Sequence, residues 1–515
     1  MARQSRLASL YGNTNLAGGP RREPVLRDLV AETLVLGTLS GTYYRGERDV
    51  AALALEVARR GWAADPRFTA AAAVYARERG YVRAAPLAAL ATGFELPETA
   101  PLAARIFPRI VRHAGDLRDL IALFLSGALR RRFGGRAQRT AAAWLANHLD
   151  EYQAMKYLGR GAAVSLADAL RLTHPRPRDE VQAALFRWVL RRPRPGDLAL
   201  LPRVAALEML PSAKPDEAAR LIAEHGLPFE AAVPRLGSVN GPATWAALAE
   251  RAPYLWLVRA LASLHRHGAF ALPGVADRVA GRIADGDAVR RAMVFPHQFA
   301  LALRALPPGA PPQVAAAVTA ALLHSVSNVP RIRRRALVAL DVSGSMLGSR
   351  DRGVAAYQIG ALFAWALARA SDPPARVVAF NTEWRDVTEW ARRCRTPDDF
   401  ALRLQDEEIC GGGTDLAQAV LAMRDEEVLV AITDSEDWAG EGFARAWARR
   451  KAADPAARAV LVQLMPYGDR VDTPQNGCVY VYGWGEDALR LAAEAVEDGV
   501  PLADRIAEMT ETMLS

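Results

Sequence analysis

The chain of 515 residues contains little cysteine and has no long apolar run. Its three cysteines, Cys394, Cys410 and Cys478, cannot all pair with one another, which argues against a disulfide framework. No apolar run reaches the ~18 residues of a membrane helix, and the opening residues MARQSRLASLYGN lack the apolar core of a secretory signal. We therefore expect a cytoplasmic protein without membrane segments.

Sequence motifs of hydrolases and nucleotide-using enzymes are also absent. The chain has no H-E-x-x-H, no G-x-x-x-x-G-K-[ST] and no second carboxylate cluster that would complete a two-metal site. This absence favours a noncatalytic protein over a metal-dependent hydrolase.

The net charge of +8 conceals two parts of opposite sign. Residues 1–335 contain 47 basic and 27 acidic side chains, a balance of +20, whereas residues 336–515 contain 18 and 30, a balance of −12. Because the chain is also longer than one core usually organises, we predict two domains, 1–335 and 336–515. The basic domain suggests a polyanionic partner, although an arginine-rich composition is the simpler interpretation.

The first domain is predicted to consist of helices in series. Residues 49–61 and 67–80 carry apolar residues at helical spacing, and each stretch ends in a glycine suited to a helix C-cap. Prolines punctuate the remainder, and no alternating strand pattern appears. This pattern favours an α-helical repeat solenoid, with an irregular helical domain as the alternative. Either would offer a long surface that suits an extended macromolecule.

A basic stretch at 130–178 is the candidate nucleic-acid interface. Its first part, RRRFGGRAQR, gathers arginines around two glycines that let the backbone approach a phosphate: Arg130, Arg131, Arg132, Arg136 and Arg139. Its second part, MKYLGR and LRLTHPRPR, adds a tyrosine, a histidine and further cations: Lys156, Tyr157, Arg160, Arg171, His174, Arg176 and Arg178. Such side chains are typical of RNA binding, but a solvated basic face has the same composition. His174 could equally satisfy carbonyls at a helix C-terminus, and the arginines of RIRRR (331–335) could contact phosphate or form a linker.

Beyond Arg335 the pattern changes to short β-rich runs separated by helical stretches. The runs lie at 336–340, 376–380, 428–433, 459–464 and 478–483, with helical stretches at 353–370 and 442–453. This alternation is typical of an α/β doubly wound parallel sheet, in which ligands bind beyond the carboxyl ends of the strands.

Three segments near predicted strand or loop ends supply oxygen ligands. They are LDVSGS with Asp341, Ser343 and Ser345, GGGTDL with Thr414, and AITDSED with Asp434. Three hydroxyls and two carboxylates favour a hard divalent cation, Mg²⁺ first, with Mn²⁺ or Ca²⁺ as alternatives. The D-x-S-x-S spacing alone also suits a capped turn, but three segments in this order favour a metal site.

These five positions match the metal-ion-dependent adhesion site, and residues 336–515 resemble a von Willebrand factor A domain. An A domain after a basic helical array resembles the Ro autoantigen family, whose helical module is called TROVE. Five segments spread along the chain are similar to family motifs: GTLSGTYYRGE (37–47), GGRAQR (134–139), MKYLGR (155–160), LRLTH (170–174) and VFPHQFALAL (294–303).

The resemblance implies HEAT-like helical repeats closed into a ring by the A domain. It implies that a basic outer surface binds small noncoding Y RNA, that a central hole accepts single-stranded ends of misfolded RNA, and that the protein acts in RNA quality control, processing or decay. The positions that match Y RNA contacts are Lys156, Arg160 and His174, with Arg136, Arg139 and Arg171 in the same basic stretch. An exoribonuclease partner such as polynucleotide phosphorylase is also implied, and we expect a monomer.

A protein–protein adaptor is the alternative function. The helical array and the metal site would then hold acidic partners, which accounts for the metal site but leaves the +20 balance of residues 1–335 without a role. Salt separates the two hypotheses because it weakens phosphate-driven RNA binding steeply, whereas a chelator would weaken a metal-dependent contact.

Overall fold

The computed structural model describes residues 25–35, 47–159, 162–348, 350–351, 354–434, 440–464, 477–483 and 486–514. Its contacts divide the chain into two compact units. Unit 1 comprises residues 1–85, 295–300 and 322–515, and unit 2 comprises residues 86–294 and 301–321. The first strand begins next to the predicted boundary, at Ala336, but the first helices of the chain belong to the same unit as the sheet.

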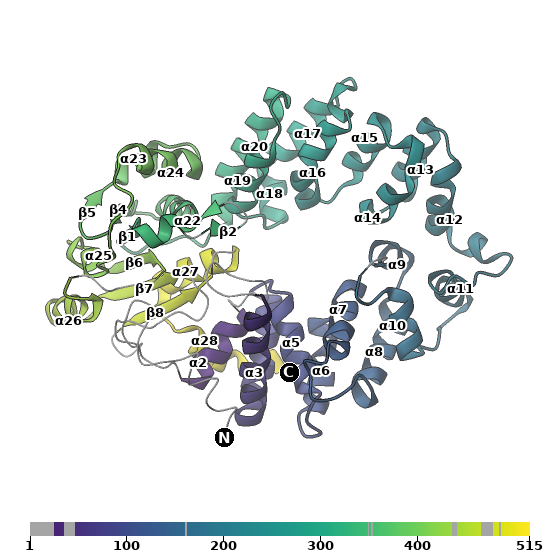
Figure 1. Cartoon of the computed structure of the whole chain (residues 1–515), viewed down its shortest axis with the longest axis horizontal. Coiled ribbons are helices and arrows are strands. Elements are labelled where there is room, and N and C mark those ends of the chain that lie inside the picture. Colours follow the sequence, from purple (N-terminus) through teal and green to yellow (C-terminus); the bar gives the residue numbers. More distant parts are fainter. Residues whose placement is uncertain are drawn as a thin grey trace. The chain divides into compact units, whose positions relative to one another are not determined.

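Helices in series occupy the chain before the sheet, as predicted (Figure 1). Their bounds are Leu26–Val35 (α2), Glu47–Ala64 (α3), Pro66–Glu78 (α4), Ala84–Gly93 (α5), Ala100–Ile110 (α6), Ala114–Leu125 (α7), Gly135–His148 (α8), Glu151–Lys156 (α9), Leu166–Thr173 (α10), Glu180–Val189 (α11), Pro202–Met209 (α12), Pro215–His225 (α13), Phe229–Ala232 (α14), Pro242–Arg251 (α15), Tyr254–Arg266 (α16), Val275–Ala284 (α17), Gly286–Arg291 (α18), Pro296–Ala305 (α19) and Pro312–Ser325 (α20). Among the described residues, no helix is long and apolar enough to cross a membrane.

Unit 2 is built from short helices that pack on helices two positions away in the chain. Helix α8 contacts α6 and α10, and α15 contacts α13 and α17. Helix α13 is amphipathic and buries Ala218, Leu221 and Ile222, which lie on one face at helical spacing. A helix this short cannot bury such a face alone, so stacking on neighbours creates the core. This packing is that of stacked helical hairpins.

One predicted helix end is wrong. Gly61 does not terminate its helix, because α3 continues to Ala64. A Cβ at Gly61 would lie 2.7 Å from Thr69 Oγ1 and 2.9 Å from Val30 Cγ2, so the glycine permits close packing between α3 and its neighbours. The second glycine, Gly80, does follow its helix, which ends at Glu78. Both glycines follow a helical pattern in the sequence, and only the packing around them shows which one ends a helix.

The last helix of the chain joins the first helices in unit 1. Helix α28 (Leu502–Leu514) packs against α2 and α4, with Ile506 and Leu514 buried. Arg67 on α4 lies 2.6 Å from the Glu511 carboxylate on α28, although both side chains are exposed and the ion pair contributes little to stability. The burial of apolar surface between these helices places the first and last described helices in one unit.

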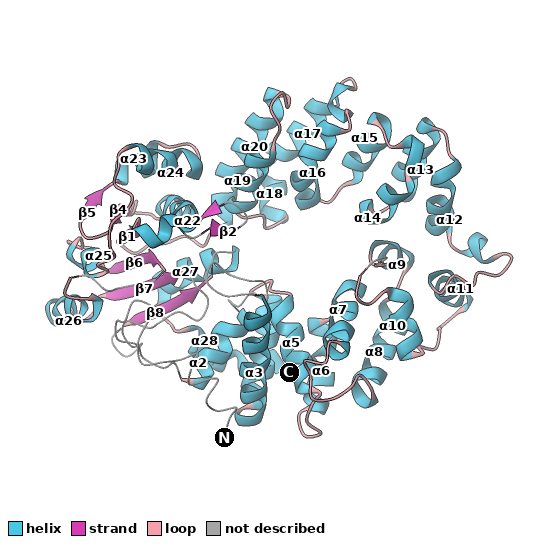
Figure 2. Ribbon diagram, in the orientation of Figure 1, coloured by secondary structure: helices cyan, strands magenta, loops and turns pink. Residues whose placement is uncertain are grey.

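A six-stranded sheet is formed by the residues of unit 1 that follow Arg335 (Figure 2). The strands are Ala336–Asp341 (β1), Arg376–Phe380 (β4), Trp384–Asp386 (β5), Val428–Thr433 (β6), Arg458–Gln463 (β7) and Cys478–Tyr482 (β8), and a separate hairpin joins Arg350–Asp351 (β2) to Val354–Ala355 (β3). The helices are Gly344–Gly348 (α21), Ala356–Ala370 (α22), Thr388–Arg393 (α23), Pro397–Asp406 (α24), Ala417–Leu421 (α25), Phe443–Ala453 (α26) and Glu486–Asp498 (α27). The order is β5-β4-β1-β6-β7-β8, and only β5 runs antiparallel to its neighbour.

The five predicted strand runs are the five parallel strands of this sheet. Strand β1 lies between β4 and β6, with Ala339 opposite Val378 on one side and Ala431 on the other. Its residues are all buried, which explains the continuous apolar run in the sequence. Helix α22 packs closely on β1 at Gly360, where a Cβ would lie 2.4 Å from a methyl group of Leu340. The chain leaves β1 toward β4 on one side and reaches β6 on the other, so the carboxyl end of β1 is a topological switch point.

The arginines that precede β1 contact acidic side chains of their own unit. Arg335 Nη1 lies 2.9 Å from Asp425 Oδ2, Arg334 Nη1 lies 3.6 Å from Glu427 Oε2, and Arg331 pairs with Asp372. These contacts favour the linker interpretation of RIRRR over phosphate binding.

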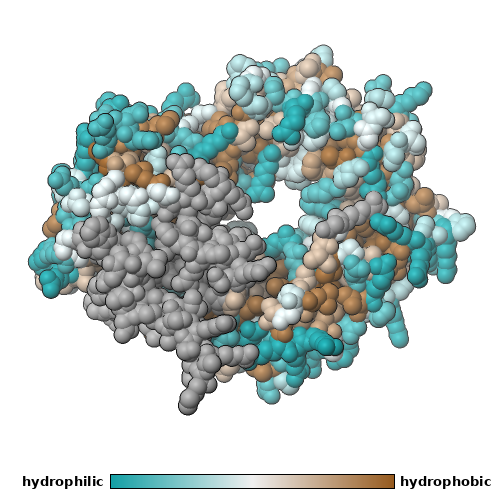
Figure 3. All heavy atoms as spheres, viewed as in Figure 1, coloured by the Kyte–Doolittle hydropathy of each residue, from teal (hydrophilic) through white to brown (hydrophobic). Residues whose placement is uncertain are grey.

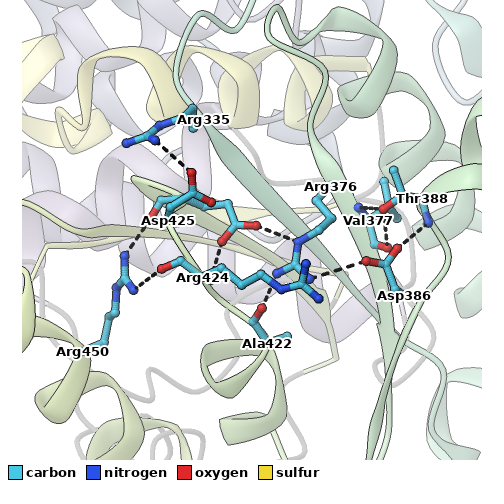
Figure 4. Close-up of polar contacts among 10 residues, drawn as sticks. Arg335, Arg376, Val377, Asp386, Thr388, Ala422, Arg424, Asp425 and Arg450 are labelled. Carbon is cyan, nitrogen blue, oxygen red and sulfur yellow. Dashed lines mark hydrogen bonds and ion pairs between the residues drawn. The ribbon is translucent and has the colours of Figure 1, made fainter.

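Two further arginines, Arg376 and Arg450, bond to groups at the amino ends of the strands (Figure 4). The Nε of Arg376 lies 2.7 Å from Glu426 Oε1, and its Nη1 lies 3.5 Å from Asp386 Oδ2. Arg450 donates to the carbonyls of Arg424 and Glu426 at 2.8 and 2.9 Å. Arginine therefore organises the amino ends of the strands, whereas the predicted metal ligands lie beyond the carboxyl ends.

Candidate nucleic-acid interface and candidate metal centre

Helix α8 carries the first predicted RNA contacts, Arg136 and Arg139. Both side chains are exposed, and because they are three residues apart they lie on the same face of the helix. The helix begins after Gly134, and Gly135 adopts φ 54° with open space where a side chain would be. Hydrophilic side chains (teal) gather over the edge of unit 2 where α6 and α8 lie (Figure 3). The glycines thus leave the backbone accessible next to two exposed guanidinium groups.

Helix α9 positions Lys156 among aromatic rings. Asp150 begins the helix by accepting a hydrogen bond of 2.7 Å from the Gln153 N–H. The Lys156 Nζ lies 5.7 Å from the ring centroid of Tyr152 and 5.6 Å from that of Tyr157, which allows cation–π contact with both. It also lies 3.8 Å from Glu230 Oε1. These contacts therefore restrain the ammonium group at a partly exposed position.

The loop after α9 depends on Arg118, a residue that the sequence did not single out. Its Nε donates to the Val164 carbonyl at 2.7 Å, and its Nη1 donates to the Tyr157 carbonyl at 3.1 Å. Gly159, at φ 69°, lies against this guanidinium: a Cβ there would be 2.2 Å from the Arg118 Cζ. The predicted contact Arg160, which follows Gly159, lies outside the described residues. Arg118 reaches this loop from α7 across about forty residues of sequence, so no local pattern indicates it.

Helix α10 carries the remaining predicted contacts, Arg171 and His174. Ser165 and Asp168 cap its first turn reciprocally, and Arg171 Nη1 lies 3.0 Å from Asp168 Oδ1. His174 is the C-cap residue, in the left-handed conformation at φ 50°, and its backbone N–H donates to the Leu170 carbonyl. The helix terminus is thus satisfied by the backbone of His174, and its imidazole stays exposed.

One hydrogen bond joins the two ends of the basic stretch. The Gln138 side chain on α8 donates to the Leu172 carbonyl on α10 at 2.7 Å. Residues 134–139 and 170–174, far apart in sequence, therefore lie on packed helices of one unit. The structure brings Arg136, Arg139, Arg171 and His174 together on α8 and α10 and places Lys156 on α9 between these two helices in the chain.

The predicted metal ligands begin with Asp341 at the carboxyl end of β1. This carboxylate is fully buried; its Oδ1 accepts from the Ser343 N–H at 2.9 Å and its Oδ2 accepts from the Thr433 hydroxyl at 2.6 Å. Thr433 ends β6, and the predicted ligand Asp434, 2% exposed, follows it. Because β1 and β6 are parallel neighbours, their carboxyl ends place Asp341 and Asp434 at the same edge of the sheet.

The three predicted hydroxyl ligands lie on two loops that bond to each other. Ser343 Oγ, after β1, lies 3.2 Å from Ser345 Oγ in the first turn of the short helix α21. The segment after β1 is joined to the glycine-rich loop by two backbone bonds, from Gly344 N to Gly412 O at 3.0 Å and from Gly411 N to Val342 O at 2.7 Å. Thr414 follows on the same loop and is nearly buried. The loops thus bring hydroxyl groups from residues 343–345 and 414 to the strand ends.

The electrostatics of this edge favour a cation. Burial, together with the nearby Asp434 carboxylate, raises the pKa of Asp341 to about 7. Two buried carboxylates destabilise each other's charged forms unless a cation lies between them. Among the described residues, no group of three or more histidine, cysteine, aspartate or glutamate side chains could hold a metal, so hydroxyl oxygens have to complete any ligand set here. Two carboxylates with three hydroxyls fit a hard divalent cation and do not fit zinc.

Comparisons with known proteins found a relative of similar sequence and a solved structure of similar fold. No family model matches this chain. A protein of Deinococcus radiodurans named RNA-binding protein RO60 is 29% identical over 309 residues, which is 56% of this chain and 56% of that protein. The alignment thus spans about half the length of the curated relative.

The crystal structure of the Deinococcus radiodurans RO (RSR) protein matches with a TM-score of 0.70. The match covers 92% of this chain and 100% of that chain at 23% sequence identity, and it establishes the fold: helical repeats followed by a von Willebrand factor A-like domain. The similarity in sequence and the shared fold confirm that this chain resembles the Ro autoantigen family, as its motifs predict.

Proposed function

We propose that this chain is a noncatalytic RNA-binding protein whose RNA-binding surface lies on α8, α9 and α10. The observation that carries the proposal is the set of cations on these helices, with Arg136, Arg139 and Arg171 exposed and Lys156 held between two tyrosines. Exposed guanidinium groups bind phosphate oxygens, and aromatic rings stack on unpaired bases. The name of the relative, an RNA-binding protein, supports the same ligand class.

The resemblance to the Ro family supports a finer proposal. The bound RNA would be a small noncoding Y RNA, and the protein would act in RNA quality control, processing or decay beside an exoribonuclease such as polynucleotide phosphorylase. The ring, and the entry of single-stranded ends of misfolded RNA into its central hole, stay predictions.

The first experiment sequences the RNA that co-purifies with the full chain at low salt and measures its affinity at several salt concentrations. The variant is Lys156→Ala with Arg160→Ala, and the matched control is Lys214→Ala with Arg220→Ala, two exposed cations of unit 2 outside α8–α10. Each phosphate contact contributes about 0.9 to the slope of log affinity against log salt concentration. We expect the first variant to lower the slope by about two and the control to leave it unchanged. Equal losses of RNA affinity in both variants would indicate a nonspecific basic face instead of a defined RNA-binding site.

We further propose that Asp341, Ser343, Ser345, Thr414 and Asp434 hold a divalent cation, Mg²⁺ first and Mn²⁺ or Ca²⁺ as alternatives. The support is the donor set: two buried carboxylates at adjacent strand ends and hydroxyls on loops that bond to each other. Neutral hydroxyl ligands leave the charge of the metal poorly compensated, so such an ion would attract a carboxylate or phosphate from a partner. The proposed metal centre would bind a partner and would not catalyse a group transfer.

The adaptor function rests on this candidate metal centre. An adaptor would capture proteins with acidic side chains, and EDTA would release them while salt acted weakly. Recovery of proteins alone in a Mg²⁺-dependent manner, with no specific RNA, would favour the adaptor over the RNA-binding protein.

A further inference from the structure

A pocket of about 360 Å³ opens in unit 2 between α9, the segment that leads into α14, and the start of α16. Its walls include the aromatic rings of Tyr152, Phe229 and Trp256, all of them partly exposed. The rings of Phe229 and Trp256 contact each other at a centroid distance of 4.8 Å, inclined by 53°. Pockets of small ligands have volumes of roughly 300–1,000 Å³, so this one is large enough for a small aromatic group.

Three polar side chains of this pocket have no hydrogen-bond or ion-pair partner among the described residues. In the part of the chain that the structure describes, neither the Tyr152 hydroxyl nor the Trp256 indole N–H makes a hydrogen bond. The exposed guanidinium of Arg251, at the end of α15, likewise forms no ion pair there. The Tyr152 and Trp256 rings are partly exposed, so these donors are available to a ligand with hydrogen-bond acceptors.

The charge of the pocket identifies the sign of that ligand. Lys156, Arg251 and Arg259 contribute three cations to its lining, against the single carboxylate of Glu230. Lys156 lies 3.8 Å from Glu230 and within cation–π distance of Tyr152, and Arg259 has an interaction of its own, so Arg251 is the one of these three cations that pairs with no carboxylate among the described residues. A net positive rim around aromatic walls suits a flat ring that carries a negative group.

We propose that this pocket binds one unpaired nucleotide of RNA, with its base against Trp256 and its phosphate at Arg251. Aromatic side chains stack on any nucleobase, and guanidinium groups bind phosphate through paired N–H donors. Since Lys156 also belongs to the proposed RNA-binding surface, a strand held by α8–α10 could place a base in this pocket. The inference rests on the proposed function and adds to it a requirement for an unpaired nucleotide.

The test compares two probes, an eight-nucleotide single-stranded RNA and a blunt duplex made from the same sequence. Trp256→Leu keeps an apolar side chain but removes the stacking surface, and Trp384→Leu, which removes an exposed indole in unit 1, is the control. We expect Trp256→Leu to weaken single-strand binding by roughly 5- to 100-fold and to leave duplex binding unchanged. Tyr152→Phe, which removes only the hydroxyl, should weaken the single strand by less.

Two outcomes would overturn the inference while leaving the proposed function intact: equal affinities of wild type and a folded Trp256→Leu for the single strand, or equal losses for both probes. Binding of neither probe by the wild type would instead count against the proposed function itself. If Trp256→Leu does not fold, photocrosslinking of the wild type to a single strand with a photoreactive base decides the question. Crosslinks at Trp256 or Tyr152 support the pocket, and crosslinks confined to other residues contradict it.

Discussion

Two buried aspartates, one in each unit, have opposite electrostatics. Asp197 in the helical unit is 4% exposed, and hydrogen bonds from Arg187 lower its pKa to about 2. Asp341 at the end of β1 is 0% exposed, and burial together with the Asp434 carboxylate raises its pKa to about 7. Both side chains are almost inaccessible to solvent, but hydrogen bonds from Arg187 outweigh the effect of burial on the pKa of Asp197, whereas burial is the largest cause of the raised pKa of Asp341. A guanidinium already compensates Asp197, whereas the cation that would compensate Asp341 has to come from solution.

A buried carboxylate that pairs with an arginine stabilises the fold, whereas one without a cation is available to bind a ligand. The Arg187 guanidinium lies 2.6 and 2.9 Å from the two oxygens of Asp197, a bidentate pair that joins α11 to the following turn. In the described part of the chain, no arginine or lysine pairs with Asp341; its hydrogen bonds come from a backbone N–H and a hydroxyl, which are neutral. A buried carboxylate that the protein leaves without a cation is a candidate ligand.

The largest effect is expected for Asp341→Ala. It removes one of the two carboxylates of the candidate metal centre, so we expect Mg²⁺ binding to fall by at least about 100-fold. RNA affinity should change by less than about twofold, since the proposed RNA-binding surface lies in unit 2. Isothermal titration with Mg²⁺ and a binding assay with the co-purified RNA measure the two effects separately.

The control for this prediction is Glu389→Ala, because Glu389 is an exposed carboxylate of the same domain that pairs with Arg392 and Arg393. It should keep full Mg²⁺ binding. A folded Asp341→Ala protein that lost RNA binding together with Mg²⁺ would show that the two units do not act independently.

A smaller effect is expected for Arg118→Ala in the helical unit. Two charge-assisted hydrogen bonds to carbonyls of the 157–164 loop disappear, and we expect a loss of about 2–4 kcal/mol in unfolding free energy. The loop follows Lys156, so RNA affinity should fall as well. Denaturant unfolding monitored by circular dichroism gives the stability, with Arg220→Ala as the control for loss of an exposed arginine. Unchanged stability would mean that the loop is held by its other contacts.

The smallest effect is expected for Asp197→Asn, and it depends on pH. Because the pKa of Asp197 in the folded protein, about 2, lies below the usual value of about 3.9, its charge stabilises the fold fully above pH ~4. That contribution is lost as the pH falls toward 2. We expect the variant to unfold a few degrees lower than wild type at pH 7 and the two transitions to converge near pH 2. A constant difference across this range would assign the effect to packing.

Local patterns are sufficient to predict the five parallel strands and the order of the candidate metal ligands along the chain. The run at 336–340 is apolar on every residue because β1 is buried on both faces, and D-x-S-x-S follows it directly. Strand β5 escaped prediction because it has three exposed residues and no apolar pattern. Gly61 was misread because its function is to let helices approach each other, and that function has the same sequence signature as a helix end.

The amino-acid sequence alone predicts the two charged parts, the helices in series and the five parallel strands, and it supplies the candidate residues of both sites. These features depend on the periodicity of apolar residues and on residue type, which are local properties of the chain. Only the folded chain shows that α28 packs on α2 and α4, that Arg118 holds the loop after Lys156, and that Tyr152, Phe229 and Trp256 share one pocket. Those pairings join residues tens to hundreds of positions apart, and they depend on which buried surfaces fit each other.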